Sequence, residues 1–275
     1  MNDLMRADAD ALAEMVPDGA KVAIGKNTCG VPSEIARALV RRGARDLHLV
    51  CVPTAGYAAD LLIGAGCVGT VETSAVTLDE TGLAPRFQAA VREGSVRLLD
   101  STCPAVYAAF RAGEKAIPFI PIRGLIGSDL VAHRPDYKVI DNPYQENDPI
   151  LVVPAINPDF ALLHAPTADR DGNVFAGADR DLALMAHAAR NSLVTVERVV
   201  DECLLEDDLT AASTITSVYI TAIAKAEAGA WPHSLRRHYK EDLAHMSLYH
   251  RQAQSPEGFA DYLQTFVFGR RAAAE

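Results

Sequence analysis

Short apolar runs alternate along the chain with stretches in which apolar residues recur every three or four positions. The runs predict buried strands, and the spacing predicts helices with one apolar face. After an expected N-terminal helix over residues 1–15, strands are predicted at residues 21–25, 47–52, 68–73, 96–99, around Phe119, 137–140, 150–153, 160–164 and 193–196. Further helices are predicted over residues 32–42, 87–92, 104–112 and 182–189.

The predicted helix over residues 32–42 has clear signals at both ends. Pro32 suits a first helical position, and Glu34 lies in the first turn, where the helix dipole favours an acid. Arg41 and Arg42 lie in the last turn, and Gly43 can adopt the left-handed conformation that ends a helix. This segment is therefore the most clearly signalled helix of the first part of the chain.

Near-continuous apolar strands that alternate with amphipathic helices indicate an α/β protein with a mostly parallel sheet covered on both faces. No repeat, biased tract or long flexible linker marks a boundary, so residues 1–275 are expected to form a single domain. In such sheets ligands bind beyond the carboxyl ends of the strands. Residues that directly follow strands are therefore the first candidates for function.

Composition narrows the function classes. The 275 residues are 49% hydrophobic and 23% charged, which is typical of a globular protein. The formal net charge of −10 argues against nucleic-acid or anionic-membrane binding, and no apolar run approaches a membrane span. The acidic first ten residues do not resemble a signal peptide, and five scattered cysteines predict neither a disulfide framework nor a zinc cage. A soluble, cytoplasmic protein is expected.

The loop between the first buried strand and its helix is the first candidate binding site. It contains Asn27, Thr28, Cys29 and Gly30. Backbone N–H groups at the start of a helix suit a carboxylate, a phosphate or an oxyanion. The alternative is a strand-to-helix turn whose glycines only relieve backbone strain, with Cys29 as an inert turn residue rather than a nucleophile.

The second candidate is the segment 117–129, in which a proline-flanked apolar strand leads into a glycine-rich bend. Arg123 could clamp a carboxylate or phosphate through its planar guanidinium group. Gly124, Gly127, Ser128 and Asp129 complete the bend. The alternative is a surface arginine that pairs with Asp129.

Carboxylates and metal ligands give weaker signals. Glu72 ends its strand as a nucleophile might, but Glu72-Thr-Ser74 is equally consistent with a capping turn. Asp169 and Asp171 resemble the opening of a calcium loop without its closing acid, so a turn is favoured. The tail histidines lack metal-ligand spacing, and no metal site is predicted; they are His233, His238, His245 and His250.

Several segments, taken in order, carry a family resemblance. They are residues 16–19, 30–32, 117–129, 159–164, 168–173 and 186–197, with a tail in which Gly229-Ala-Trp-Pro-His233 precedes Tyr239 and Asp242. Together these segments resemble the α subunit of family I CoA-transferases, specifically the glutaconate CoA-transferase branch. The likeness covers nearly the whole chain.

The resemblance implies an open α/β/α sandwich, the CoA-transferase fold shared with sugar-phosphate isomerases. It also implies a partner, a homologous β subunit, for example in an α2β2 hetero-oligomer, with acyl-CoA and a carboxylic acid as substrates and no permanently bound cofactor. In such enzymes a β-subunit glutamate attacks the thioester, giving a mixed anhydride and then a glutamyl-CoA thioester. An acceptor carboxylate finally takes up the CoA. Residues 26–30 contain no glutamate where a β-type Glu-x-G loop would fall, so no catalytic nucleophile is expected on this chain.

On this interpretation Asn27–Gly30 would supply oxyanion-binding amides, together with the Arg123–Asp129 bend. Ser74 and Ser101, which follow strands, would contribute to acyl specificity. A related class of CoA-thioester hydrolases, which cleave carbon–carbon bonds, uses an acid after the strand that ends at Leu99. Asp100 keeps that alternative open, although the glutamate that would follow it is missing. A non-catalytic module that binds acyl-CoA or a sugar phosphate is the third hypothesis.

Overall fold

The apolar strands assemble into one large and mainly parallel sheet. The computed structural model describes residues 4–25 and 30–269, so the candidates Asn27, Thr28 and Cys29 lie outside the described residues. All neighbouring strands along the main path of the sheet pair in parallel. The order along that path is β1 (Met5–Arg6), β15 (Ala222–Lys225), β13 (Asn191–Val200), β11 (Phe160–Asp169), β2 (Lys21–Ile24), β3 (Leu47–Cys51), β5 (Val68–Thr73) and β7 (Arg97–Asp100).

Short strands extend this framework at two places. β12 (Val174–Phe175) folds back antiparallel on the end of β11 and pairs with β14 (Thr214–Ile215). β4 (Thr54–Ala55) and β6 (Ala75–Val76) form a separate parallel pair beyond β3 and β5. Both additions lie beyond the carboxyl ends of main-sheet strands, which is where ligands bind in parallel sheets.

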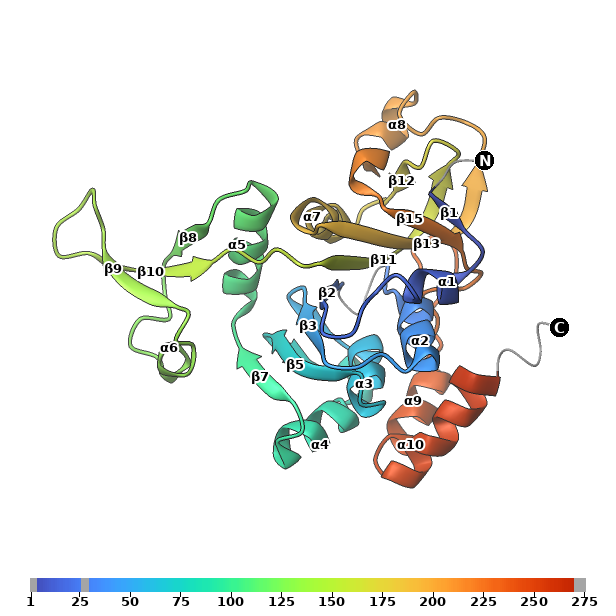
Figure 1. Cartoon of the computed structure of the whole chain (residues 1–275), viewed down its shortest axis with the longest axis horizontal. Coiled ribbons are helices and arrows are strands. Elements are labelled where there is room, and N and C mark those ends of the chain that lie inside the picture. Colours follow the sequence, from blue (N-terminus) through green and yellow to red (C-terminus); the bar gives the residue numbers. More distant parts are fainter. Residues whose placement is uncertain (1–3, 26–29, 270–275) are drawn as a thin grey trace.

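Helices cover both faces of the sheet, as Figure 1 shows. One hydrophobic cluster joins the sheet to α1 (Ala9–Ala13), α2 (Ser33–Arg42), α3 (Tyr57–Gly64), α4 (Pro85–Glu93), α9 (Leu243–Gln252) and α10 (Pro256–Leu263). The other cluster joins the opposite face to α5 (Cys103–Glu114) and α7 (Arg180–Ala188). The predicted α/β/α sandwich with a mostly parallel sheet is confirmed. Short helical segments complete the description: α8 (Asp208–Ala211), η1 (Asp79–Thr81), η2 (Ser217–Tyr219) and η3 (Gln264–Phe268).

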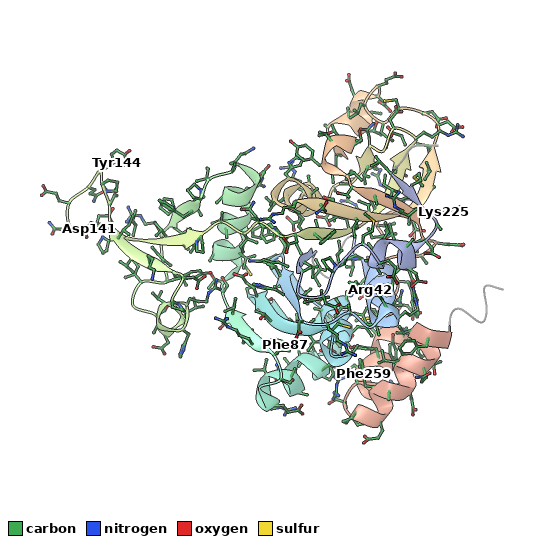
Figure 2. The ribbon with its side chains drawn as sticks, viewed as in Figure 1. Arg42, Phe87, Asp141, Tyr144, Lys225 and Phe259 are labelled. Atoms are coloured by element: carbon green, nitrogen blue, oxygen red, sulfur yellow. The ribbon has the colours of Figure 1, made fainter. Side chains whose placement is uncertain are left out.

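An arm projects from the α5 side of the molecule (Figure 1). Its three strands β8 (Phe119–Ile122), β10 (Pro149–Pro154) and β9 (Lys138–Asp141) pair antiparallel, and the short helix α6 (Asp129–His133) connects β8 to β9. The sequence pattern placed these strands in the parallel sheet, and that prediction is wrong. Tyr144, at the tip of the arm in Figure 2, is 96% exposed.

Most of the elements that local signals predicted lie within two residues of their observed bounds, although α3, α9, α10 and β15 were not predicted. α2 ends at Gly43, whose φ of 72° is left-handed, and the sequence-predicted strand 68–73 coincides with β5. The N-terminal prediction is wrong, because β1 comes first and α1 covers only Ala9–Ala13. β1 pairs with β15, more than two hundred residues away, and that pairing satisfies the backbone of a segment whose local pattern favoured a helix.

The two C-terminal helices pack on α3 through buried polar contacts. Tyr249 of α9 donates a hydrogen bond to Asp60 Oδ2 (2.7 Å), and Tyr262 of α10 contacts Tyr57 Oη (3.0 Å). These contacts fix α9 and α10 relative to the sheet, and with them the segment 226–242 that connects β15 to α9. In the described ranges, no helix combines the length and the apolar character that a membrane crossing requires.

Candidate active site

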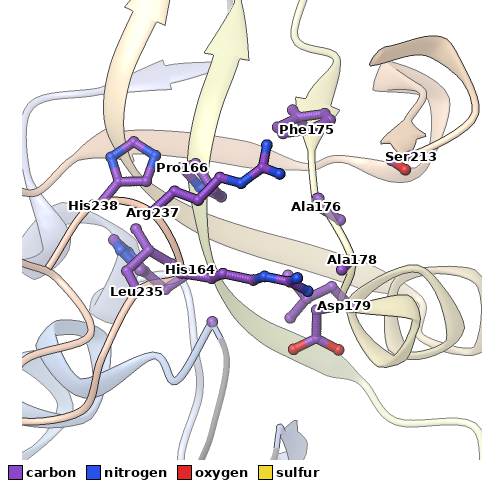
Figure 3. Close-up of a pocket in the computed structure, with 14 residues that line it drawn as sticks. His164, Pro166, Phe175, Ala176, Ala178, Asp179, Ser213, Leu235, Arg237 and His238 are labelled. Atoms are coloured by element: carbon purple, nitrogen blue, oxygen red, sulfur yellow. The ribbon is translucent and has the colours of Figure 1, made fainter. Parts of the chain in front are cut away.

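A cavity of about 310 Å³ lies beside Gly30, between β2 and α2 in the sequence (Figure 3). Its walls come from β11, from the segment that joins β12 to α7, and from the segment that precedes α9. The apolar part of the lining consists of Pro166, Phe175, Ala176, Ala178, Leu182 and Leu235. The cavity therefore lies at the end of the sheet where a parallel fold is expected to bind its ligand.

One wall of this cavity is positively charged. Arg236, Arg237 and His238 are consecutive, exposed, and part of the lining. Figure 3 shows Arg237 reaching across the cavity from this segment towards the side of Phe175 and Ala176. Asp179 lines the opposite side, where its side chain accepts a hydrogen bond from the backbone N–H of Asp181 and caps α7. An apolar cavity with one cationic wall suits an acyl group that carries, or meets, a carboxylate.

Gly30 is held tightly against β11. Its carbonyl oxygen accepts a hydrogen bond from the His164 N–H (3.1 Å), and its φ of +56° is left-handed. A Cβ at this position would lie 2.6 Å from the His164 carbonyl oxygen and 3.0 Å from Leu182 Cδ1. Both the backbone conformation and the close approach therefore require glycine.

A buried polar cluster adjoins the cavity through His164, the member of the cluster that lines it. His164 of β11 is fully buried, and its Nε2 donates to Glu197 Oε1 of β13 (2.9 Å), because a carboxylate can only accept. Tyr239 Oη donates to the same oxygen (2.8 Å). Burial alone would raise the pKa of Glu197, but hydrogen bonds from His164, Tyr239 and the Ala228 N–H hold that pKa at about 2.

A second cavity of about 290 Å³ adjoins the first. The two share Pro166, Phe175 and His238, and the second extends along Arg198 towards Cys203. Arg198 Nε donates to Thr167 Oγ1 (3.1 Å). The two cavities therefore adjoin on the same side of the molecule, beside the end of β11.

Of the predicted binding residues that the structure describes, Gly30 is the one that lines the first cavity. Ser74 follows β5, and its hydroxyl donates to the Pro53 carbonyl (2.8 Å) and lies 3.1 Å from Cys103 Sγ. Ser101 is buried, with its hydroxyl 2.8 Å from Tyr137 Oη. The role of both serines in acyl specificity stays a prediction.

Glu72 and Asp100 end the adjacent strands β5 and β7 in very different surroundings. Glu72 is 4% exposed and contacts Lys21 Nζ at 3.1 Å, Arg134 Nη2 at 2.9 Å and His48 Nε2 at 3.2 Å. Burial alone would raise the pKa of Glu72, but His48, Lys21 and Arg134 lower it to about 2. Asp100 is exposed, and its Oδ1 accepts from the neighbouring Ser101 N–H.

The glycine-rich bend lies on the arm. Arg123 is exposed and forms a two-pronged ion pair with Asp148 rather than with Asp129, the acid that the sequence alternative named. Gly124 and Gly127 are left-handed, Ser128 Oγ donates to the Leu125 carbonyl (2.6 Å), and Asp129 begins α6. A substrate role for this bend stays a prediction.

The turn at Asp169 satisfies its own polar groups. Asp169 Oδ1 accepts from the N–H groups of Asp171 and Asn173, and Oδ2 accepts from Asn173 Nδ2 and the Leu204 N–H. Cys203 approaches Asp169 and Asp171 closely enough to share a metal ion, yet the carboxylate of Asp169 is already fully hydrogen-bonded. The turn that the sequence favoured is therefore present.

The cavity residues other than Gly30, and the residues Glu197 and Tyr239 that contact the cavity residue His164, were missed as site residues. Glu197 lies 33 residues from His164 and 42 residues from Tyr239, its two hydrogen-bonded partners. A local sequence pattern could therefore not connect these three residues. One signal was available, because His164 and Glu197 interrupt or end otherwise apolar strands. The run Arg236-Arg237-His238 was a second signal for a cationic wall.

Comparison with known proteins defines the class. A family model described as coenzyme A transferase matches residues 6–226, so this chain belongs to the coenzyme A transferase family. It is similar to the A-type subunit of 3-oxoadipate CoA-transferase from Pseudomonas knackmussii, with 29% identity over 97% of this chain and 94% of that protein. It is also similar to the A-type subunit of glutaconate CoA-transferase from Acidaminococcus fermentans, with 27% identity over 94% of this chain and 86% of that protein. The chain is an α-type subunit of such a transferase.

The structure of glutaconate CoA-transferase from Acidaminococcus fermentans superimposes on this chain with a TM-score of 0.89 at 24% identity, covering 97% of this chain and 89% of that one. It confirms the predicted fold. A cholesterol ring-cleaving hydrolase subunit of Rhodococcus jostii is also similar, at 27% identity over 86% of this chain and 83% of that protein. The family model and the two transferase subunits support transfer of CoA and not the hydrolase alternative.

Proposed function

We propose that this chain is the subunit that shapes the substrate cavity of a heteromeric CoA-transferase, while a homologous β subunit supplies the glutamate that forms the covalent bond. The enzyme moves CoA between an acyl-CoA and a carboxylic acid. The observation that carries this proposal is the cavity beside Gly30, which combines an apolar lining with the cationic side chains of Arg236 and Arg237.

The acids around the cavity support a nucleophile on the partner. Glu197 accepts hydrogen bonds from His164, Tyr239 and two backbone N–H groups, and Asp179 caps α7. A carboxylate with several donors around it is a weak nucleophile, because attack would require those hydrogen bonds to break. On this argument Glu197 is not placed to attack a thioester, and Asp179, which lines the first cavity, is engaged as the cap of α7.

The cavity fits the two substrates that the reaction exchanges. The acyl group would lie among Phe175, Leu182 and Leu235, and Arg237 would bind the carboxylate of the acceptor acid. When the partner's glutamate attacks the thioester carbon, the carbon–sulfur bond breaks, CoA leaves as a thiolate, and negative charge develops on the carbonyl oxygen. N–H donors from residues 27–30 would stabilise that charge.

The remaining parts of the proposal concern the assembly. CoA enters and leaves as a substrate, so no resident cofactor is required. The likeness to single subunits of named transferases supports a hetero-oligomer, for which α2β2 is one arrangement. The net charge of −10 and the scattered cysteines support a cytoplasmic location.

Co-expression tests the proposal. The chain is purified alone and together with an encoded neighbour of similar size that carries a glutamate in an early Glu-x-G loop. Transfer of CoA from an acyl-CoA to a panel of carboxylic acids is then measured. We expect exchange from the two-chain complex only. Full turnover by this chain alone would refute the division of labour.

A further inference from the structure

One carboxylate, that of Glu197, receives hydrogen bonds from four separate places. Its Oε1 accepts from Tyr239 Oη (2.8 Å), His164 Nε2 (2.9 Å) and the Gly229 N–H (3.2 Å). Its Oε2 accepts from the Ala228 N–H (2.9 Å). The side chain is 13% exposed and lies in a polar cluster, next to the cavity residue His164, rather than in either hydrophobic core. Such convergence fixes the positions of all the donors at once.

Two of these donors hold the cationic wall. Tyr239 Oη also accepts from the Ala230 N–H (3.0 Å), so residues 228–230 and Tyr239 are tied to each other as well as to Glu197. Leu235 and Tyr239 form an isolated β-bridge. Arg236, Arg237 and His238 lie between Leu235 and Tyr239 in the sequence. The cationic wall is therefore held at both of its ends.

The other donor side chain, His164, holds the wall at Gly30. The imidazole of His164 is fixed between Glu197 and Thr195 Oγ1, which lies 3.0 Å from Nδ1. The backbone N–H of the same residue donates to the Gly30 carbonyl, and Gly30 packs against Leu182. The spacing between Gly30 and the cationic wall therefore depends on the bonds that Glu197 makes to His164 and Tyr239.

We infer that Glu197 is a positioning residue that acts on substrate through Arg237, by holding the segment 228–239 so that the guanidinium of Arg237 reaches into the cavity towards Phe175. This inference rests on the proposed function, because it assigns Arg237 to an anionic substrate. Glu197 itself touches no reacting atom. Its loss should weaken substrate binding by the same route as loss of Arg237.

A double-mutant cycle on the two-chain complex tests this inference. Glu197→Gln keeps the shape of the side chain but replaces one acceptor oxygen by a donor. We expect Glu197→Gln and Arg237→Ala each to raise the KM for the acceptor acid about tenfold with little change in kcat, as for loss of a ground-state contact. If Glu197 acts through Arg237, adding Glu197→Gln to Arg237→Ala should raise KM no further.

Matched controls separate positioning from general damage. Glu241→Gln makes the same substitution near the same segment, where Glu241 contacts His233 Nδ1 at 3.3 Å outside the cavity, and should leave KM unchanged. If Glu197→Gln does not fold, the same cycle is run with Tyr239→Phe, which removes one of the four donors. Multiplicative effects on KM in the double variant, or a fall in kcat with KM unchanged, would overturn the inference. Absence of exchange in the wild-type complex would instead refute the proposed function.

Discussion

The Oε1 atom of Glu72 lies 2.9 Å from Nη2 of Arg134, and both side chains are almost fully buried. This ion pair ties the end of β5 to the segment between α6 and β9, so it joins the arm to the main sheet. Lys21 and His48 contact the other oxygen of the same carboxylate. Glu72 is therefore an anchor for three cationic or hydrogen-bonding side chains, and this role explains why it lies at the end of a strand.

Glu72→Gln should destabilise the chain without removing the chemistry. We expect the free energy of unfolding to fall by about 2 kcal/mol, less than for a fully orphaned buried cation, because Asp136 still pairs with Arg134. Denaturant titration measures this change, and Glu146→Gln on the exposed arm should alter stability by less than about 0.5 kcal/mol. A stable Glu72→Gln variant whose complex had lost all exchange activity would instead contradict a purely structural role for Glu72.

Asp60 should make stability depend on pH in an unusual direction. Burial raises its pKa from 3.8 to about 6, against hydrogen bonds from the Phe87 N–H and Tyr249. Because the folded state then binds the proton more tightly than the unfolded state, the contribution of Asp60 is present below pH 3.8 and is lost as pH rises through 6.

Asp60→Asn isolates this contribution. The stability of the variant relative to wild type should increase between pH 4 and pH 6, by at most about 3 kcal/mol, and stay constant at higher pH. Urea unfolding at several pH values measures the difference, with the exposed Asp261→Asn as the matched control. The free energies of unfolding of wild type and Asp60→Asn would then be compared at pH 4 and pH 7. The same difference at both pH values would contradict the burial of an ionised Asp60.

Gly30→Ala should distort the wall of the cavity. Gly30 and Gly94 have similar left-handed φ values, +56° and +66°, but a Cβ at Gly94 meets nothing within 4 Å. Gly94→Ala should therefore cost about 1 kcal/mol from backbone strain alone. Gly30→Ala should cost more, because His164 and Leu182 must also move, and it should lower exchange activity. Equal losses of stability with full activity in both variants would show that the close approach at Gly30 has no functional consequence.

The sequence predicted most strands of the main sheet because their signals are local, but it did not predict β1 and β15. The apolar run 68–73 matches β5, and the capping pattern from Pro32 to Gly43 matches α2. The arm could not be predicted in this way, since the apolar runs at 137–140 and 150–153 look alike whether they pair in parallel or antiparallel. Their pairing is decided by β8 and α5, which lie elsewhere in the chain.

The candidate site was predicted only in part, for a similar reason. Gly30 carries a local signal, a glycine between a strand and a helix. Glu197 depends on His164 and Tyr239, whose partnership arises only when β11, β13 and the segment before α9 come together. Arg123 shows the opposite case. Its local pattern strongly indicates an anion clamp, but the anion that it binds is the carboxylate of Asp148 in the same chain.

The central claim is that this chain shapes the cavity while another chain forms the covalent bond. Peptide mass spectrometry of the two-chain complex, stopped during turnover with an acyl-CoA, tests that claim most directly. We expect the CoA adduct on a glutamate of the partner chain, with no acyl or CoA adduct on any peptide of this chain. An adduct on Glu72, Asp100 or any other side chain of this chain would contradict the account.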